Sequence, residues 1–396
     1  MKILSIATFL PYPPDHGTRT RTWNLLRRLA AKHEVTLVTW VRPSDKPESV
    51  EVCRKHFHEV IVLTGAGGKP SIATRAWIRA LSTMKRTPPY TELMTKQRQA
   101  VPELSRRFDI AVAEDDAAIL FMPAVACPTL VHRHNVFSDT LEGLRDSGAL
   151  GALRKLKWTI ELPAWRRFDK DLCARADVSI VTTEHARQRL GARVPMTRIE
   201  VVPNGADPLL AAVGPPRGHK AVFVGTMSYE PNADAAVRFC RDVWPRVRQQ
   251  VPDAEFHIIG RDPMAAVREI SQPGVVVTGS VDDVAIACEG ALVGICPLYS
   301  GSGIKNKTLE MMGLGLPVVA TSLGSEGIAA TPDQGLIEVD DDALMAEHII
   351  RLLLDPARSA DLGIAARDYL AANFSWEQAT AIYERVIDDI VSPEQP

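Results

Sequence analysis

Hydrophobic and polar positions divide the chain into short apolar runs separated by longer amphipathic stretches. Such runs predict strands buried on both faces, and the amphipathic stretches between them predict helices. Alternating strands and helices are typical of parallel α/β sheets. The predicted strands are 2–8, 34–40, 109–113, 128–132, 178–182, 221–225, 255–260, 274–279, 292–298 and 316–321.

The stretch 292–321 is the clearest unit of this kind, with a strand, a glycine turn, a helix and a second strand. Gly301 and Gly303 end the first strand and allow backbone N–H groups to approach a ligand closely. A glycine turn that opens a helix favours an anion, because unpaired N–H groups and the positive end of the helix dipole meet there. Lys305 and Lys307 add positive charge at the same point.

Glu310, one turn into the predicted helix, offers acceptor oxygens that suit ribose hydroxyls, so the unit suggests a nucleotide site. A purely structural interpretation competes with this one, since a Glu in the first turn complements the helix dipole and a Lys beside a loop is usually solvated. Asn306 stands where both the P-loop and the dinucleotide fingerprint need Gly, which excludes these two phosphate motifs.

The same stretch resembles the donor-site signature of the retaining glycosyltransferases of the GT-B fold, family 4, which reads Glu, seven residues, Glu, and later Pro-Val-Val-Ala-Thr. The resemblance implies that Glu310 is the second Glu, which binds the ribose of a sugar nucleotide. Ser302 stands where the family has the first Glu, which contacts the transferred sugar. A branch that reads Gly-x-Gly-x-Lys-x-Lys is more similar, and it implies that Lys305 and Lys307 bind phosphate.

Other positions are similar to donor-binding residues of the family. Thr226 and Asn232 replace an Arg and a Lys that clamp the diphosphate, so Arg261 and the N–H groups of the turn are expected to supply part of that binding. Gly17 resembles the lone glycine of the first loop, and Val281 lies where the family holds the nucleobase. The donor-binding residues implied are Gly17, Gly225, Thr226, Asn232, Arg261, Val281, Gly301, Ser302, Gly303, Ile304, Lys305, Lys307 and Glu310.

Polar residues also follow two predicted strands of the first half, at the edge where α/β sheets bind ligands. Glu114, Asp115 and Asp116 follow one strand, and His134 follows the next. The family has an acid or a His near the reacting sugar here, able to assist an acceptor hydroxyl. Three adjacent acids are also typical of a cap or turn. The predicted catalytic residues are Glu114, Asp115, His134 and Lys307.

The resemblance covers essentially the whole chain and implies an α/β GT-B fold, with two Rossmann-like lobes whose parallel sheets face a central cleft. Pro203-Asn204-Gly205 is similar to the turn before the interlobe linker, which places the hinge near 205–217. The expected domains are an acceptor-binding lobe at 1–205, a donor-binding lobe at 206–375 and a helix at 376–396 that crosses back to the first lobe. Residues 324–327 are expected to form a polar loop.

Charge is distributed unevenly along the chain. Residues 1–205 carry 32 Lys and Arg against 21 Asp and Glu, whereas the remainder carries 14 against 27. The basic half predicts an anionic partner, and basic runs with interleaved aromatic residues at 70–107 and 153–170 indicate an anionic membrane surface. Ordinary helix packing and solvation explain the same residues. Arg19 and Arg21 are interpreted as phosphate or acceptor ligands, or as surface arginines. No nucleic acid partner is expected.

A chain of 396 residues is long enough for two domains. No apolar run approaches the roughly 20 residues of a membrane-spanning helix, and the N-terminus lacks a signal-peptide pattern. We therefore expect a cytoplasmic protein, with peripheral contact on the inner face of the membrane as an open alternative. Six cysteines without a CxxC pair predict reduced thiols and argue against zinc.

The resemblance implies a retaining glycosyltransferase of the hexosyltransferase type, which moves a sugar from a nucleotide-sugar donor to a sugar or lipid-linked acceptor in polysaccharide, glycolipid or glycoconjugate biosynthesis. No cofactor or metal is expected, because two lysines take the place of a divalent ion. The alternatives are a sugar-nucleotide epimerase or hydrolase on the same fold, and a non-catalytic sugar-nucleotide-binding protein.

Overall fold

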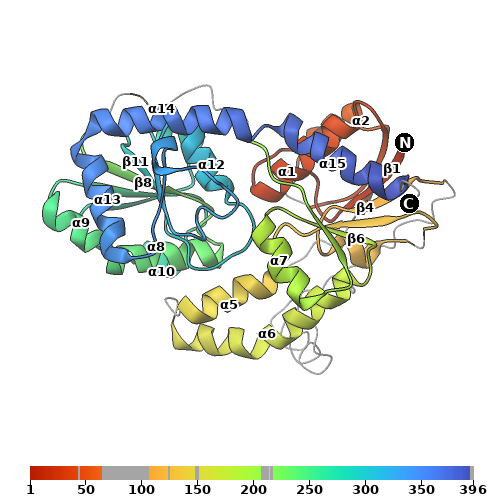
Figure 1. The fold of residues 1–396 in the computed structure, drawn as a ribbon, viewed down its shortest axis with the longest axis horizontal. Helices are drawn as coiled ribbons and strands as arrows, with labels where there is room; N and C mark the ends of the chain where they lie inside the picture. Colours follow the sequence, from red (N-terminus) through yellow and green to blue (C-terminus); the bar gives the residue numbers. More distant parts are fainter. Residues whose placement is uncertain are drawn as a thin grey trace. The chain divides into compact units, whose positions relative to one another are not determined.

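The computed structural model describes residues 1–42, 45–64, 107–123, 125–147, 151–206, 214 and 217–392. These residues form two compact units, each described below by itself (Figure 1). The predicted basic region 70–107 lies outside the described residues except for residue 107, and so does most of the predicted hinge at 205–217. Among the described helices, none has the length and apolar character needed to cross a membrane.

The first unit comprises Met1–Ser138, Glu161–Gly205 and Trp376–Pro396. Its seven strands pair in parallel in the order β3-β2-β1-β4-β5-β6-β7. They are β1 Lys2–Ala7, β2 Glu34–Val41, β3 Glu59–Thr64, β4 Ile110–Ala113, β5 Thr129–His132, β6 Val178–Val181 and β7 Arg198–Val201. The strand order reverses between β1 and β4, so the carboxyl ends of these two strands are where such sheets bind ligands.

The second unit comprises Asp139–Ile160 and Ala206–Ser375. Its six strands also pair in parallel, in the order β10-β9-β8-β11-β12-β13, and the order reverses between β8 and β11. They are β8 Lys220–Val224, β9 Glu255–Ile259, β10 Val275–Gly279, β11 Val293–Cys296, β12 Val318–Ala320 and β13 Leu336–Glu338. The two sheets confirm the predicted pair of Rossmann-like lobes.

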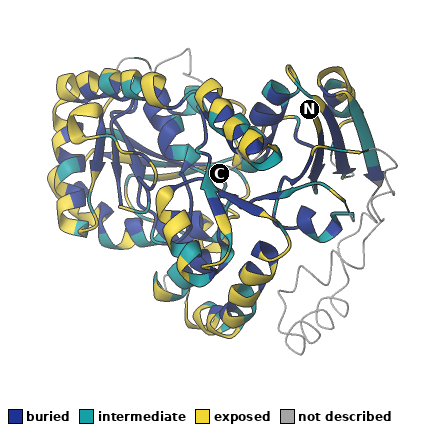
Figure 2. Cartoon of the chain, turned by 45° about the vertical axis from the view of Figure 1, so that its right-hand side comes forward, coloured by how far each residue is buried: buried dark blue, intermediate teal, exposed yellow. Residues whose placement is uncertain are grey.

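In the described parts of the chain, helices connect most successive strands and cover the sheets, so the central strands are buried on both faces while the helices expose their outer faces (Figure 2). This is why the strands read as continuous apolar runs rather than as alternating patterns. The helices are α1 Gly17–Leu29, α2 Pro47–His56, α5 Phe137–Ser147, α6 Ala152–Cys173, α7 Glu184–Arg193, α8 Glu230–Asp242, α9 Trp244–Gln250, α10 Ala265–Arg268, α11 Val284–Ala287, α12 Asn306–Gly313, α13 Asp342–Leu354, α14 Pro356–Asn373 and α15 Trp376–Val391, with 3-10 turns η1 Ala118–Phe121 and η2 Pro332–Gln334.

Residues 139–160 group with the second unit, so they interrupt the lobe predicted at 1–205. The Ser147 hydroxyl donates to Asp234 at 2.5 Å, and Arg154 pairs with Glu230 at 2.7 Å. Both acidic partners belong to α8, at the start of the second unit's fold. These polar contacts between segments far apart in sequence carry no local signal, which is why the chain pattern did not predict them.

The second basic run, 153–170, forms most of α6. Neither of its two tryptophans is exposed, so they do not act as aromatic anchors at a surface. Trp158 is fully buried, and the Trp165 ring packs against the rings of Phe137 and Phe168, with centroids 4.9 and 6.1 Å away. Helix packing is therefore the correct interpretation of these two aromatic residues.

The C-terminal helix α15 belongs to the first unit, as predicted. Its apolar residues recur at helical spacing and enter the core formed by α1 and the strands, with Tyr383 and Ile387 fully buried. At the margin of this contact, Arg28 pairs with Glu377 at 2.8 Å and Lys32 pairs with Glu384 at 2.7 Å. Exposed pairs of this kind contribute little, so the apolar stripe holds the helix.

The Pro-Asn-Gly turn lies where α15 begins. Arg21 of α1 donates to the carbonyl of Pro203 at 2.9 Å and to the side-chain oxygen of Asn204 at 2.6 Å. A Cβ on Gly205 would lie 2.5 Å from the backbone nitrogen of Trp376. The turn therefore needs glycine because the start of α15 passes directly against it.

We predict that Gly205→Ala lowers the thermal midpoint of the protein, because the new methyl group overlaps the Trp376 backbone at a cost of about 2 kcal/mol. Gly191→Ala in α7 is the matched control, since a Cβ there meets only one side-chain atom at 3.9 Å. Glycine to alanine inside a helix stabilises by roughly 0.5–1 kcal/mol, so this control should raise the midpoint. Equal midpoints for the two variants would contradict the close contact at Gly205.

Candidate functional site

The glycine turn predicted between two strands lies between β11 and α12. Gly301 and Gly303 have φ angles of 121° and 73°, a region that a residue with a Cβ adopts only at a cost. Ser300 and Ser302 are buried, and Ile304 is nearly so. The two glycines therefore turn the chain within a packed site, as the sequence predicted.

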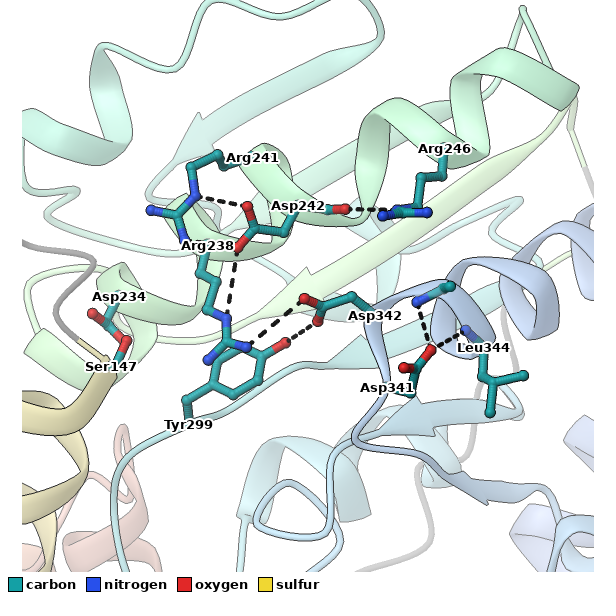
Figure 3. Close-up of polar contacts among 11 residues, drawn as sticks. Ser147, Asp234, Arg238, Arg241, Asp242, Arg246, Tyr299, Asp341, Asp342 and Leu344 are labelled. Atoms are coloured by element: carbon teal, nitrogen blue, oxygen red, sulfur yellow. Dashed lines mark hydrogen bonds and ion pairs between the residues drawn. The ribbon is translucent and has the colours of Figure 1, made fainter.

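Tyr299, which opens this turn, is fixed by a polar network that the sequence did not reveal (Figure 3). The guanidinium of Arg238 lies 3.5 Å from the centre of the Tyr299 ring, and the Tyr299 hydroxyl donates to Asp342 at 3.1 Å. Arg238 also lies 3.8 Å from Asp342 and 3.7 Å from Asp242. Burial raises the pKa of Tyr299, so the hydroxyl remains a donor. These residues come from α8, the turn after β11 and α13. They are far apart in the sequence, so their spacing does not predict the contact.

Three predicted residues of the second unit meet at the end of β8. Lys307 donates to the side-chain oxygen of Asn232 at 2.6 Å, and the Asn232 amide donates to the Thr226 carbonyl at 2.9 Å. A Cβ on Gly225 would lie 2.8 Å from the Asn232 amide nitrogen and 3.3 Å from Cε of Lys307. The absence of a side chain at Gly225 therefore allows the lysine to reach this strand end.

The ammonium of Lys307 has a lowered pKa in this arrangement. The pKa of Lys307 is lowered to about 8, mainly by burial; Lys305 contributes to the lowering, and Cys296 and Glu310 oppose it. Glu310 lies one turn along α12, and burial raises its pKa, whereas Lys307 lowers it. An ammonium with few competing charges interacts strongly with an incoming anion. Lys307 and Glu310, two of the residues from which the sequence predicted a nucleotide site, thus interact through their charges on α12.

Lys305 is engaged differently from Lys307. Its ammonium donates to the carbonyl of Gly303 and lies 3.5 Å from the carboxylate of Glu326, which in turn accepts the N–H of Gly303 at 3.1 Å. Lys305 and Glu326 are both buried. Sequence reasoning missed Glu326 and treated 324–327 only as a polar loop. The available signal was an acid between two glycines directly after a buried strand.

The remaining predicted donor residues lie in neighbouring loops. The N–H of Met227, next to Thr226, donates to the Arg261 carbonyl at 2.9 Å, so the turns that follow β8 and β9 are adjacent. Val281 follows β10 and packs partly against the core. Gly17 is the first residue of α1 in the first unit. The structure brings Thr226, Asn232 and Lys307 together, and places Arg261 beside them through its backbone.

In the first unit, Glu114 and Asp115 follow β4, and each contacts β1 or the residue after it. Glu114 is buried and accepts the Ser5 hydroxyl at 2.9 Å, and burial raises its pKa to about 8. Asp115 accepts the N–H and hydroxyl of Thr8, both at 2.9 Å, and the N–H groups of Ala117 and Ala118. Asp115 therefore caps a turn, while its predicted catalytic role stays a prediction.

His134 contacts the same strand end. Its Nε2 lies 2.7 Å from the Glu114 carbonyl, which makes that nitrogen the protonated one and leaves Nδ1 as the acceptor. The pKa of His134 is lowered to about 3, mainly by burial and in part by the nearby charge of Arg21. A neutral imidazole with so low a pKa is a weak base near pH 7.

The other charged residues of this region are paired with one another. Arg133, fully buried, forms ion pairs with Asp116 at 2.5 Å and with Asp169 of α6. Arg19 pairs with Asp45 at 2.7 Å. Arg19 and Arg21 are both buried, so their interpretation as surface arginines is wrong. Sequence reasoning found no partner for Asp116, because Asp169 and Arg133 are distant in the chain.

Family comparisons cover most of the chain. The model of Glycosyltransferase Family 4 matches residues 16–208, and the model of Glycosyl transferases group 1 matches residues 218–355. A relative from Klebsiella pneumoniae, described as an uncharacterized 44.6 kDa protein in the cps region, is 22% identical over 393 residues, which cover 94% of this chain and 96% of the relative.

Solved structures superpose over nearly the full length. Sucrose-phosphate synthase from Thermosynechococcus elongatus has a TM-score of 0.66 at 16% identity and covers 98% of each chain. HepE from Anabaena, in complex with UDP, has a TM-score of 0.64 at 13% identity and covers 98% of this chain and 100% of HepE. These likenesses confirm the predicted GT-B fold.

We predict that Glu114→Gln stabilises the protein more at pH 8 than at pH 5. The buried acid keeps its proton up to about pH 8, whereas the unfolded chain releases it near the ordinary value of 4.5, so stability falls as pH rises between these values. Glutamine removes that loss, so the thermal midpoint of the variant relative to the wild type should be several degrees higher at pH 8 than at pH 5.

Glu184→Gln is the control, since Glu184 is exposed on α7 and Arg187 lowers its pKa. Its midpoint difference from the wild type should not change between pH 5 and pH 8. A Glu114→Gln difference that is equally flat would show that Glu114 is ionised in the folded protein.

Proposed function

We propose that this chain, a GT-B glycosyltransferase with family 4 and group 1 domains, transfers a hexose from a nucleotide-sugar donor to an acceptor hydroxyl. The transfer retains the configuration at the anomeric carbon. The observation that carries the donor assignment is the contact of Lys307 with Asn232 beside Gly225. This contact puts a half-buried ammonium at the carboxyl end of β8 and at the start of α12, where a phosphate is favoured.

In this proposal, different residues of the second unit bind different parts of the donor. Lys307 and N–H groups at the start of α12 bind the diphosphate and stabilise its charge as it departs, with no metal required. Glu310 accepts hydroxyl groups of the ribose. Arg261 and Thr226 flank the diphosphate, and Val281 lies beside the nucleobase. Preorganised cationic groups of this kind stabilise a leaving group because they need no reorganisation during the reaction.

Neither Glu114 nor His134 readily takes the acceptor's proton near pH 7. Glu114 is protonated below about pH 8 and His134 has a pKa of about 3. We therefore assign the proton to the departing diphosphate oxygen, while the C–O bond to the acceptor forms on the face from which the diphosphate leaves. Glu114 and His134 then act as hydrogen-bonding groups for the acceptor or the sugar rather than as proton acceptors.

The chemical classes of donor and acceptor are proposed by analogy with similar proteins. HepE was solved with UDP, and the Klebsiella pneumoniae relative lies in the cps region. By analogy, we propose a nucleoside diphosphate sugar as donor and a sugar or lipid-linked acceptor, in polysaccharide, glycolipid or glycoconjugate biosynthesis.

The epimerase or hydrolase alternative predicts release of free nucleotide without any acceptor. The non-catalytic alternative predicts donor binding without turnover.

A membrane partner is supported by the exposed face of α6. Leu153, Leu156 and Ile160 lie on one face of the helix and are 86, 58 and 62% exposed. Lys155 is exposed and Lys157 half-buried on the same helix turn. Apolar side chains with adjacent lysines match the acyl boundary and the anionic headgroups of a bilayer. We propose that this face contacts the inner surface of the cytoplasmic membrane.

The donor proposal predicts that one of UDP, GDP or ADP, alone or as a sugar nucleotide, raises the thermal midpoint, because a ligand at 100 times its Kd adds about 2.7 kcal/mol to stability. Lys307→Ala should weaken binding roughly 10- to 100-fold, since a hydrogen bond to a charged group contributes about 1.5–3 kcal/mol. Glu310→Ala should weaken the binding of nucleotides but not the binding of inorganic pyrophosphate, which has no ribose. Arg358→Ala, which removes an exposed charge on α14, is the control and should bind as the wild type. The absence of any nucleotide shift would reject the donor site.

The membrane proposal predicts that replacing Leu153, Leu156 and Ile160 together by Ser reduces sedimentation with vesicles of 30% phosphatidylglycerol about 10-fold, because the apolar contact area is lost. The control replaces Leu354 and Ile364, which are exposed by 58 and 62% on α13 and α14, by Ser. If both sets of variants sediment equally, α6 is not the contact.

A further inference from the structure

Glu326 is a buried acid that touches the glycine turn of the second unit. One carboxylate oxygen accepts the Gly303 N–H at 3.1 Å, and the other lies 3.5 Å from the Lys305 ammonium. Lys305 also donates to the Gly303 carbonyl. Glu326 and Lys305 therefore hold both backbone polar groups of Gly303 between them.

The loop that carries Glu326 is rigidly placed. A Cβ on Gly324 would lie 2.1 Å from the Cys296 carbonyl at the end of β11, so this loop lies directly against the strand that precedes the glycine turn. The Thr308 hydroxyl of α12 donates to the Gly324 carbonyl at 2.8 Å, and the Gly324 N–H donates to Thr321 at 3.1 Å. The carboxylate is thus preorganised relative to α12 and to the turn.

The two ends of the site differ in charge. At Gly303, the carboxylate of Glu326 neutralises Lys305 and occupies a backbone N–H that a phosphate would need. At Gly225, Lys307 contacts only the neutral amide of Asn232 among its hydrogen-bond partners in the described structure. A carboxylate repels a phosphate but accepts hydroxyl groups strongly, because an ionised acceptor forms the stronger hydrogen bonds.

We propose that Glu326 is a specificity-determining residue that makes the Gly301–Lys305 end of the site select the hydroxyl groups of the transferred sugar and reject a phosphate. This inference rests on the proposed function, since it assumes that a sugar nucleotide binds here. It reassigns Lys305 from the diphosphate to the sugar end and leaves Lys307 as the lysine that binds phosphate. It also supplies an acidic side chain near Ser302 from a loop that follows the next strand.

The test compares Glu326→Gln with the wild type by calorimetric titration of two pairs of ligands, UDP with UDP-glucose and GDP with GDP-mannose. Glutamine keeps one oxygen to accept the Gly303 N–H and replaces the oxygen that faces Lys305 by an NH2 donor, so the charge and one acceptor are lost. We expect the affinity for the nucleoside diphosphate to stay within about 3-fold or to increase, because Lys305 is no longer neutralised. The affinity for the sugar nucleotide should fall about 10-fold, as for loss of a charged hydrogen bond.

Two further variants separate this role from a structural one. Glu338→Gln alters the neighbouring contact with the Ser325 hydroxyl and should leave both affinities unchanged. The double variant Lys305→Met, Glu326→Gln restores neutrality, so its affinity for the diphosphate should return to the wild-type value while the sugar nucleotide remains weakly bound. This variant also tests the inference if Glu326→Gln alone fails to fold around an uncompensated lysine.

An equal fall in affinity for diphosphate and sugar nucleotide in Glu326→Gln would overturn the inference and would assign Glu326 to loop structure alone. A wild-type protein that binds neither pair of ligands would instead reject the proposed function, and the inference with it. A wild-type protein that binds the sugar nucleotide no more tightly than the diphosphate, with no change in Glu326→Gln, would reject the inference and retain the donor site.

Discussion

The second unit depends on the close approach of backbone at Gly225, where β8 ends. A Cβ on Gly260, at the end of β9, would lie 1.7 Å from the Gly225 carbonyl, and a Cβ on Gly225 would overlap Asn232. Two neighbouring strands are therefore followed by residues without side chains. The Gly225 backbone fills the space beside Gly260, and the Asn232 amide and the Lys307 side chain fill the space beside Gly225. Because the interior is close-packed, a methyl group at either glycine displaces the contact that defines the proposed phosphate site.

Buried charges in both units are placed beside partners, and this pairing positions loops as well as neutralising charge. Arg133 joins the ends of β4 and β5 to α6 through Asp116 and Asp169, and Glu326 joins the loop after β12 to the glycine turn. Removing one partner of such a pair leaves an uncompensated charge, which costs more than the pair itself contributes. Rigid loops at the strand ends follow from this constraint, and preorganised sites require them.

Much of the fold was predictable because buried parallel strands leave continuous apolar runs, and because glycine is needed where φ is positive, as at Gly301 and Gly303. The lysine of the candidate site was also predictable, since Lys307 lies in the first turn of a helix that follows a glycine turn. Glu326 and the Tyr299 network were not, because their partners lie on other elements. Residues 139–160 were assigned to the first lobe for the same reason, although Ser147 and Arg154 bind α8.

By itself the sequence determined ten of the thirteen strands that the structure describes, that the chain forms two domains, and where glycine opens a helix toward an anion. Strands β3, β7 and β13 were not predicted. These properties depend on local periodicity and backbone sterics, which neighbouring residues in the chain specify. Only the tertiary structure decided that Lys305 is paired with Glu326 while Lys307 contacts Asn232, and that burial holds Glu114 protonated up to about pH 8. Charge and pKa depend on desolvation and on partners brought together by folding, and sequence spacing specifies neither.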